Sequence, residues 1–268
     1  MKKILMSTLF LLFISLLSAC GRDEDILRVG MDLSYPPFET IEDGEPTGIS
    51  VDVAYMLGEY LGREVEIVNT DFGSMIPSLN SGEIDIIIGS MSITEDRKQS
   101  VNFSDPYFYF KIISLVNQDF ADAHGIDEDS SIDDLLAIDE AEFAGIVAQV
   151  STQIPTDLGK NVTEFTELST AIQSVSQGTS DILLMSSFPV TNGHRAHPDS
   201  TLVIWDPIQS SPIGMAVEKG NDDLLAQANE FIATMHDEGG AYDTLRGRWD
   251  EDIEALLERY GLEFFIDE

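Results

Sequence analysis

The sequence predicts an α/β fold of two lobes, each a doubly wound, mainly parallel sheet flanked by helices. Two observations support this prediction. Apolar runs of strand length alternate with amphipathic stretches of helical spacing, and this alternation occurs in two separate units along the chain. Two further extended segments, at 107–111 and 209–213, follow the first and the second unit, so we expect the chain to cross between the lobes there.

The first unit, between residues 26 and 88, has the order strand, helix, strand, helix, strand. The expected elements are a strand at 26–31, a helix capped by Ser50, a strand at 65–68, a short helix with Met75, Ile76 and Leu79 on one face, and a strand at 84–88. Residues 84–88 form a nearly continuous apolar run, which is typical of a strand buried on both faces. The unit therefore predicts a doubly wound sheet.

The second unit repeats the alternation, and a helical segment follows it. The expected elements are a strand at 143–147, a helix near Thr156, a strand at 163–165, a helix at 169–177, a strand at 181–185 and a helix from Leu224 to Met235, with Gly239 and Gly240 as a stop. With hinge crossings at 107–111 and 209–213, residues 26–106 and 214–268 form lobe I, and residues 112–208 form lobe II.

Residues 1–19 have the pattern of a signal peptide. Lys2 and Lys3 precede an apolar run of about 14 residues, which is shorter than the roughly 20 residues of a membrane-spanning helix. The single cysteine of the chain, Cys20, follows small residues and resembles the lipidated cysteine of a bacterial lipobox. The segment therefore predicts an exported protein that a lipidated tether, residues 20–25, anchors to the outer face of a membrane.

The charge of the chain excludes a polyanionic partner. Lys and Arg total 14 against 49 Asp and Glu, a formal net charge of −35. Nucleic-acid binding depends on basic patches, so we expect no nucleic acid, and such a solvated acidic surface favours a monomer. His194 and His197 have metal-like spacing, but we expect them in a surface loop without a third ligand. No metal and no cofactor are therefore predicted.

The stretch from Gly89 to Arg97 is the strongest candidate for a binding site. It follows the buried strand at 84–88 and opens a short helix, for which Thr94 is a suitable N-cap. Ligands of open α/β sheets bind beyond the carboxyl ends of the strands, where this turn must lie. The hydroxyls of Ser92 and Thr94 and the guanidinium of Arg97 would together receive a carboxylate. A plain helix cap with a solvated arginine is the alternative.

Five motifs in order carry a resemblance to a known family. They lie at residues 32–39, 48–52, 71–79, 90–97 and 103–107, and shorter ones follow at 149–153, 178–181 and 239–242. Together they resemble the solute-binding proteins of polar amino-acid ABC importers over about residues 26–249. The resemblance implies a two-lobed periplasmic-binding-protein-like fold of type II. Among the members of the family, the binders of lysine, arginine, ornithine or histidine look most similar.

The resemblance also implies roles for individual residues. Arg97 would bind the ligand's carboxylate, assisted by Ser92 and, from lobe II, by Thr152 and Gln153. Tyr35 and Phe72 would sandwich the ligand's side chain, and Asp32 would read its distal group. Packing beneath the proline-rich loop is the alternative for the two rings, and a local turn acceptor is the alternative for Asp32.

One position departs from the family pattern. Ser186 stands where the family usually has an aspartate that binds the ligand's α-ammonium group. A buried ammonium without a carboxylate partner is costly. Either Ser186, the carbonyl of Ser90 and another acid replace that aspartate, or the ligand is not an ordinary α-amino acid.

The sequence thus predicts an extracytoplasmic binding protein rather than an enzyme. It would close over a polar or basic amino acid, or a similar carboxylate, and deliver it to a permease driven by a cytoplasmic ATPase. Two alternatives remain: a dehydratase-like enzyme of the same fold that acts on a cyclic carboxylic acid, and a ligand-sensing input domain. Residues 251–268 extend past the usual end of the family, and we expect them to pack back on lobe I.

Overall fold

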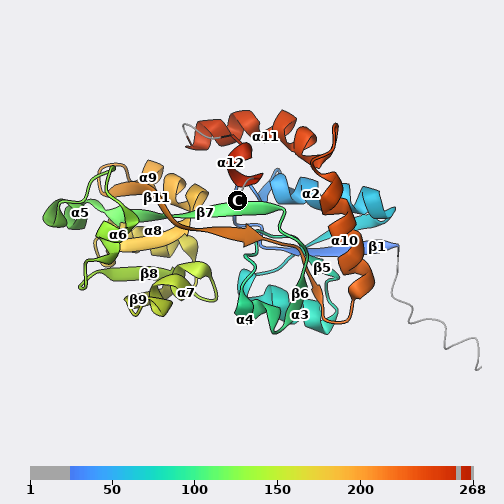
Figure 1. Cartoon of the computed structure of the whole chain (residues 1–268), viewed down its shortest axis with the longest axis horizontal. Coiled ribbons are helices and arrows are strands. Elements are labelled where there is room, and N and C mark those ends of the chain that lie inside the picture. Colours follow the sequence, from blue (N-terminus) through green and yellow to red (C-terminus); the bar gives the residue numbers. More distant parts are fainter. Residues whose placement is uncertain (1–24, 258–260, 267–268) are drawn as a thin grey trace, which may run out of the picture.

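A computed structural model describes residues 25–257 and 261–266, which form two lobes along the long axis of the molecule (Figure 1). The predicted signal peptide, Cys20 and residues 21–24 of the predicted tether lie outside the described residues. In the described part of the chain, no helix combines the length and the apolar character that crossing a membrane requires.

Lobe I contains a five-stranded sheet in which one strand runs against the other four. In spatial order its strands are β4 (Glu64–Asn69), β1 (Ile26–Met31), β5 (Ile86–Ile87), β12 (Ala216–Glu218) and β6 (Val101–Phe103). β1 is parallel to β4 and β5, whereas β12 is antiparallel to both of its neighbours. The predicted mainly parallel sheet is therefore confirmed, and the reversed strand comes from the chain that returns from lobe II.

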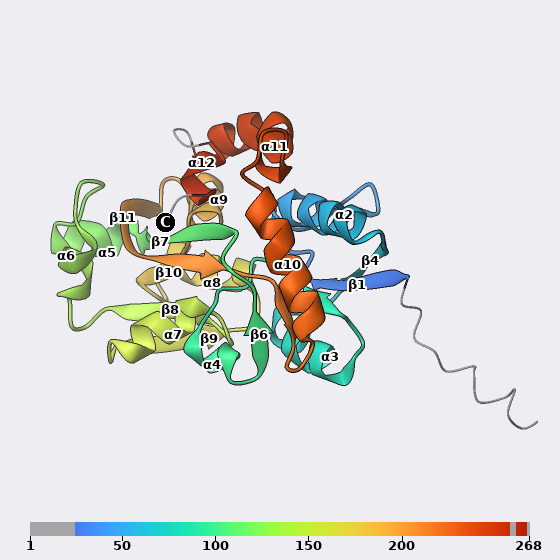
Figure 2. The ribbon, with the colours of Figure 1, turned by 45° about the vertical axis from the view of Figure 1, so that its right-hand side comes forward.

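Helices cover both faces of this sheet (Figure 2). The helices of lobe I are α2 (Ile49–Leu61), α3 (Met75–Ser81), α4 (Glu95–Lys98), α10 (Asp222–Thr234), α11 (Ala241–Leu257) and α12 (Glu263–Ile266), with the 3-10 turn η1 (Phe72–Ser74) and the hairpin β2 (Thr40–Glu42) and β3 (Glu45–Thr47). Ile86 packs in a core with side chains of α2 and α10, whereas Ile87 packs with side chains of α3. Alternate residues of β5 thus enter two cores, which explains the continuous apolar run.

The start of α2 differs from the predicted start. The prediction that Ser50 caps this helix is wrong, because the helix begins at Ile49 with Gly48 as its N-cap, and Ser50 is buried in its first turn. Gly48 has a φ of 133°, and a Cβ atom at this position would collide with the backbone carbonyl of Phe38. A glycine is therefore required for the proline-rich loop and α2 to approach each other this closely.

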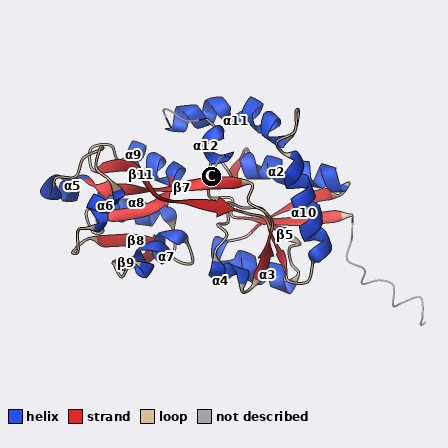
Figure 3. Cartoon of the chain, in the orientation of Figure 1, coloured by secondary structure: helices blue, strands red, loops and turns tan. Residues whose placement is uncertain are grey.

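Lobe II repeats the arrangement with a second five-stranded sheet. In spatial order its strands are β11 (Thr201–Ile213), β7 (Phe108–Asn117), β10 (Ile182–Ser186), β8 (Glu142–Ile146) and β9 (Asn161–Phe165). β7 is antiparallel to both neighbours, and β8 is parallel to β9 and β10. Figure 3 shows both sheets inside the molecule and the helices around them.

The helices of lobe II correct one prediction. They are α5 (Gln118–His124), α6 (Ile132–Leu136), α7 (Val150–Asp157), α8 (Leu168–Ser176) and α9 (Ser187–Ala196). His194 lies in the last turn of α9 and His197 follows as its C-cap, so the expected surface loop is a helix. Gly193 permits this helix to pack closely, because a Cβ atom there would lie 3.1 Å from side-chain atoms of Leu115 and Ile172. Among the described residues, no cluster of three possible metal ligands occurs.

The two lobes are connected by strands that pair with each other. Residues 108–112 of β7 pair with residues 209–213 of β11 in an antiparallel register, from Phe108 opposite Ile213 to Ile112 opposite Gln209. The register then shifts between Ile204 and Gln209 before the pairing continues in lobe II. The two segments predicted to cross between the lobes thus form one hydrogen-bonded ribbon.

The C-terminal residues pack at the junction of the lobes rather than on lobe I alone. The ring of Phe265 in α12 is fully buried (0% exposed). It stacks on Phe188 of α9 at 5.0 Å and meets Phe38 and Phe110 edge-on at 5.8 and 5.7 Å. These four rings come from the proline-rich loop, β7, α9 and α12, so the C-terminal segment contacts both lobes.

Candidate ligand-binding site

A cavity of about 450 Å³ lies between the two lobes. Lobe I contributes residues that follow β1, β4 and β5, and lobe II contributes residues that follow β8 and β9 or end β10. In each lobe the parallel strands thus end at the cavity. Carboxyl ends of parallel strands are the usual place for ligands in open α/β sheets.

Arg97 reaches from lobe I to lobe II across this cavity. Its backbone N–H donates to Oγ1 of Thr94 at 3.3 Å, so Thr94 caps α4 as predicted. The guanidinium donates to the carbonyl oxygens of Ser92 at 2.7 Å and Ala148 at 2.9 Å. Burial lowers the pKa of Arg97 to about 10, so the group stays charged at neutral pH. The alternative of a solvated arginine does not fit this geometry.

Both predicted aromatic residues, Phe72 and Tyr35, line the cavity. The guanidinium carbon lies 5.0 Å from the ring centre of Phe72, which is the geometry of a cation–π contact. Tyr35 is nearly parallel to Phe110, with ring centres 6.4 Å apart, and its hydroxyl hydrogen-bonds the hydroxyl of Ser186 in lobe II. Ser92 also lines the cavity, and its hydroxyl accepts a hydrogen bond from Ser211 at 2.8 Å.

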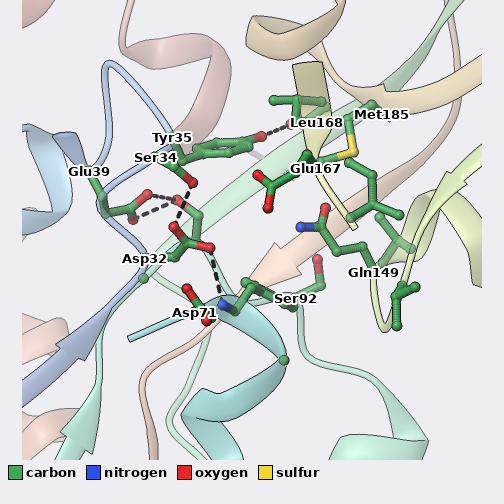
Figure 4. Close-up of a pocket in the computed structure, with 18 of the residues that line it drawn as sticks. Asp32, Ser34, Tyr35, Glu39, Asp71, Ser92, Gln149, Glu167, Leu168 and Met185 are labelled. Carbon is green, nitrogen blue, oxygen red and sulfur yellow. Dashed lines mark hydrogen bonds between the residues drawn. The ribbon is translucent and has the colours of Figure 1, made fainter. Parts of the chain in front are cut away.

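Carboxyl groups outnumber cations in the lining. Among the described residues, the cavity is lined by the acids Asp32, Glu39, Asp71 and Glu167 and by one base, Arg97. Asp32 accepts hydrogen bonds from Oγ of Ser34 at 2.5 Å and from the backbone N–H of Phe72 at 3.1 Å, so it also acts as a local turn acceptor (Figure 4).

Glu39 is the most deeply buried of these acids. Its side chain is 1% exposed and accepts hydrogen bonds of 2.7 and 3.1 Å from Oγ of Ser90. Burial raises the pKa of Glu39 to about 8, because the charged carboxylate is poorly solvated there. Ser90 holds its position with a φ of 51°, a strained value for a serine.

The lobe II wall differs from the predicted one. Thr152 and Gln153 do not line the cavity: Oγ1 of Thr152 donates to the carbonyl of Ile146 at 2.9 Å, and Nε2 of Gln153 donates to Asp157 at 2.8 Å. Both lie further along α7 than Gln149 and Val150, which do line it. The helix turns these later residues of the motif towards β8 and towards Asp157.

Among the polar lining residues that sequence reasoning missed are Glu39, Asp71, Gln149 and Glu167. For three of them, the position just after a predicted strand was a signal in the sequence. Asp71, Gln149 and Glu167 lie within three residues of the end of β4, β8 or β9. Glu39 follows a proline-rich loop that turns back towards the sheet, and its position depends on tertiary packing.

Comparison with known proteins agrees with this geometry. The model of the bacterial extracellular solute-binding proteins, family 3, matches residues 27–251. The L-cystine-binding protein TcyJ of Escherichia coli (strain K12) is 27% identical over 234 residues, which cover 85% of this chain and 84% of that protein. The arginine-binding extracellular protein ArtP of Bacillus subtilis (strain 168) is 23% identical over 242 residues, with 87% and 92% covered.

Solved structures lead to the same assignment. An ancestral arginine-binding protein bound to arginine has a TM-score of 0.71 and 30% identity, with 85% of this chain and 99% of that chain covered. The ancestral amino-acid-binding protein AncCDT-1, a precursor of cyclohexadienyl dehydratase, has a TM-score of 0.71 and 31% identity, with 84% and 95% covered. The two-lobed fold and the family resemblance predicted from the motifs are thereby confirmed, and the chain belongs to the bacterial extracellular solute-binding proteins, family 3.

Proposed function

We propose that this protein binds a cationic amino acid between its lobes and delivers it to the permease of an ABC importer. The observation that supports this ligand class is the charge of the cavity, in which Asp32, Asp71 and Glu167 outnumber a single guanidinium, while Glu39 is largely protonated at neutral pH. A ligand that carries one carboxylate and two positive groups has a net charge of +1 and therefore reduces this negative excess. Relatives named for arginine and histidine binding favour the same class.

Arg97 would hold the ligand's carboxylate. A guanidinium has five N–H donors in a planar fork, and the contacts with Ser92 and Ala148 use two of them. The remaining donors would form charge-assisted hydrogen bonds, each contributing about 1.5–3 kcal/mol. Phe72 fixes the guanidinium from one face, so little side-chain entropy is lost when the ligand arrives.

The acids of lobe I would meet the ligand's side-chain cation. Asp32 and Asp71 line the cavity near Phe72, and Glu39 lies deeper with Ser90. Tyr35 and Phe72 supply aromatic faces, on which a cation or its alkyl stem gains about 0.5–2 kcal/mol. Ser90 and Thr94 serve the site indirectly in this proposal: Ser90 orients Glu39, and Thr94 positions Arg97.

Closure of the lobes would accompany binding. The ribbon formed by residues 108–112 and 209–213 would bend as the hinge, and a ligand that contacts both lobes would stabilise the closed form. For the protein's location, we propose that the signal peptide at 1–19 is removed and that lipidated Cys20 holds a monomer at the membrane. These statements are supported by the sequence pattern and by the extracellular character of the family.

Calorimetric titration with a panel of amino acids tests the proposed function. We expect the wild-type protein to bind arginine, lysine or histidine, and Arg97→Ala to lose at least a hundredfold in affinity, since it removes the carboxylate's partner. Lys98→Ala is the matched control, because Lys98 is the next residue of α4 and pairs only with exposed Glu95 in the described contacts. A folded wild-type protein that binds none of the panel would contradict the proposal.

A dehydratase-like activity is the second candidate function, favoured by one observation. Glu39 is a cavity acid whose pKa is raised to about 8, and groups of this kind act as general acids and bases. AncCDT-1, described as a precursor of a dehydratase, has a similar fold. Turnover of a cyclic dicarboxylic acid by the purified protein would favour this candidate over transport.

A further inference from the structure

We propose that Glu167 is the residue through which lobe II recognises the positive charge of the ligand. This inference rests on the proposed function and adds a specificity-determining residue to the same cavity. Glu167 lies two residues after β9, at the N-cap position of α8, and it lines the cavity. In Figure 4 its carboxyl group points into the space between Tyr35 and Gln149.

Glu167 differs in kind from the rest of the lobe II wall. The other residues that lobe II contributes to the cavity are uncharged: Ile112, Ile146, Val147, Gln149, Val150, Thr166, Leu168, Met185 and Ser186. Within the described part of the chain, every other ionisable group of the lining belongs to lobe I. Any ionic contact between lobe II and the ligand therefore has to involve Glu167.

The hydroxyl of Ser186 is already engaged in a hydrogen bond between the lobes. Its hydroxyl hydrogen-bonds the hydroxyl of Tyr35, which belongs to lobe I. This contact joins the lobes at the cavity, as does the contact of Arg97 with the carbonyl of Ala148. Ser186 thus holds the two lobes together, and a neutral hydroxyl engaged in this way cannot balance the charge of an ammonium group.

The side chain of Glu167 is available for a ligand. It is exposed, and although the residue occupies the N-cap position, its side chain accepts no hydrogen bond from the first turn of α8. An N-cap glutamate without such a bond contributes little to the helix. Neutralising this side chain should therefore change binding without changing the fold.

The arrangement makes closure depend on charge. When the lobes close, Glu167 would approach a lobe I wall that carries the carboxylates of Asp32 and Asp71, together with Glu39, which is largely protonated at neutral pH. Like charges oppose this approach, whereas a cation placed between the walls attracts both. A ligand shifts a conformational equilibrium only by interacting differently with the two states, and a positive group between the walls does so.

Calorimetry with three probes tests this inference. Arginine carries both an α-ammonium and a guanidinium, citrulline lacks the guanidinium charge, and 5-guanidinopentanoate lacks the α-ammonium. We expect Glu167→Gln to weaken arginine binding at least tenfold. Of the two analogues, only the one that retains the positive group contacted by Glu167 should lose affinity by a similar factor in Glu167→Gln. The comparison therefore identifies whether that group is the α-ammonium or the guanidinium.

The control is Glu164→Gln, because Glu164 is an exposed residue of β9 outside the cavity. It should leave all three dissociation constants within twofold of the wild-type values. X-ray scattering gives a second readout: we expect unliganded Glu167→Gln to be more compact than the wild type at low salt, because one repelling charge is removed.

Two outcomes would overturn the inference. If Glu167→Gln binds arginine as tightly as the wild type, Glu167 does not recognise the positive charge of the ligand, although the proposed transport function stands. If the folded wild type binds none of the three probes, the cationic ligand class fails and the inference fails with it.

Discussion

A carboxyl group in the interior makes the stability of this protein depend on pH. Glu39 holds its proton up to a pH of about 8 in the folded state, whereas a glutamate with the ordinary pKa of 4.5 loses it earlier in the unfolded chain. Between these values the folded state binds the additional proton. The contribution of Glu39 to the free energy of unfolding therefore falls as pH rises, by about 1.4 kcal/mol per unit, and levels off above pH 8.

Glu39→Gln should remove this dependence. We expect the stability of the variant, relative to the wild type, to increase between pH 5 and pH 8, as measured by urea unfolding at a series of pH values. Glu42→Gln is the control, because Glu42 is exposed on β2 only three residues away. Parallel pH profiles for the wild type and Glu39→Gln would show that Glu39 is not protonated in the folded protein.

At the scale of single elements, one glycine determines where α2 begins. Gly48 combines a φ of 133° with a backbone contact that excludes a Cβ atom. We expect Gly48→Ala to destabilise the protein by about 1–3 kcal/mol in chemical unfolding, because the loop or the helix must shift.

Gly247→Ala provides the comparison for this prediction. Gly247 lies within α11, and a Cβ atom there would meet nothing within 4 Å. Alanine is favoured over glycine in helices by up to about 1 kcal/mol, so this variant should be neutral or more stable. Equal losses at both positions would contradict the role assigned to Gly48.

Elements with a clear periodic pattern could be predicted from the sequence, and elements set by tertiary contacts could not. The buried strand β5 and the cap at Thr94 were predictable because the apolar run and the capping residue are local signals. The cap of α2 was not, because it depends on the approach of Phe38. The helix at His194 was not either, because its glycine and proline indicate a loop until Gly193 packs against lobe II.

In the candidate site, too, residues in recognised motifs could be predicted, whereas residues placed by tertiary packing could not. Arg97, Tyr35 and Phe72 were found because an ordered family motif contains them, and they do line the cavity. Glu167 was overlooked because no motif marks it, and only the end of β9 at the cavity brings it into the same lining as Asp32. Thr152 and Gln153 lie in a recognised motif, yet the direction of α7 turns them away.

At the scale of the whole molecule, the C-terminal segment connects lobes that are otherwise joined by the crossing ribbon and by contacts across the cavity. Phe265 is buried among Phe38, Phe110 and Phe188. Truncating a buried phenylalanine typically costs about 3–5 kcal/mol, so we expect Phe265→Ala to lower the free energy of unfolding by this amount.

Phe264→Ala is the natural control for this prediction, since its neighbouring ring is only partly buried. We expect it to cost clearly less in the same denaturant titration. Similar losses for the two variants would mean that α12 stabilises the protein without a specific contribution from the four-ring cluster.

The pairing of the two crossing segments has a consequence for the energetics of capture. Because residues 108–112 and 209–213 are hydrogen-bonded to each other, they have to bend as one ribbon, which restricts the mutual orientations open to the lobes. Two separate linkers would allow a much wider range, and ordering it would reduce the affinity. The paired ribbon thus restricts orientational entropy before the solute arrives, and more of the contact energy remains for affinity.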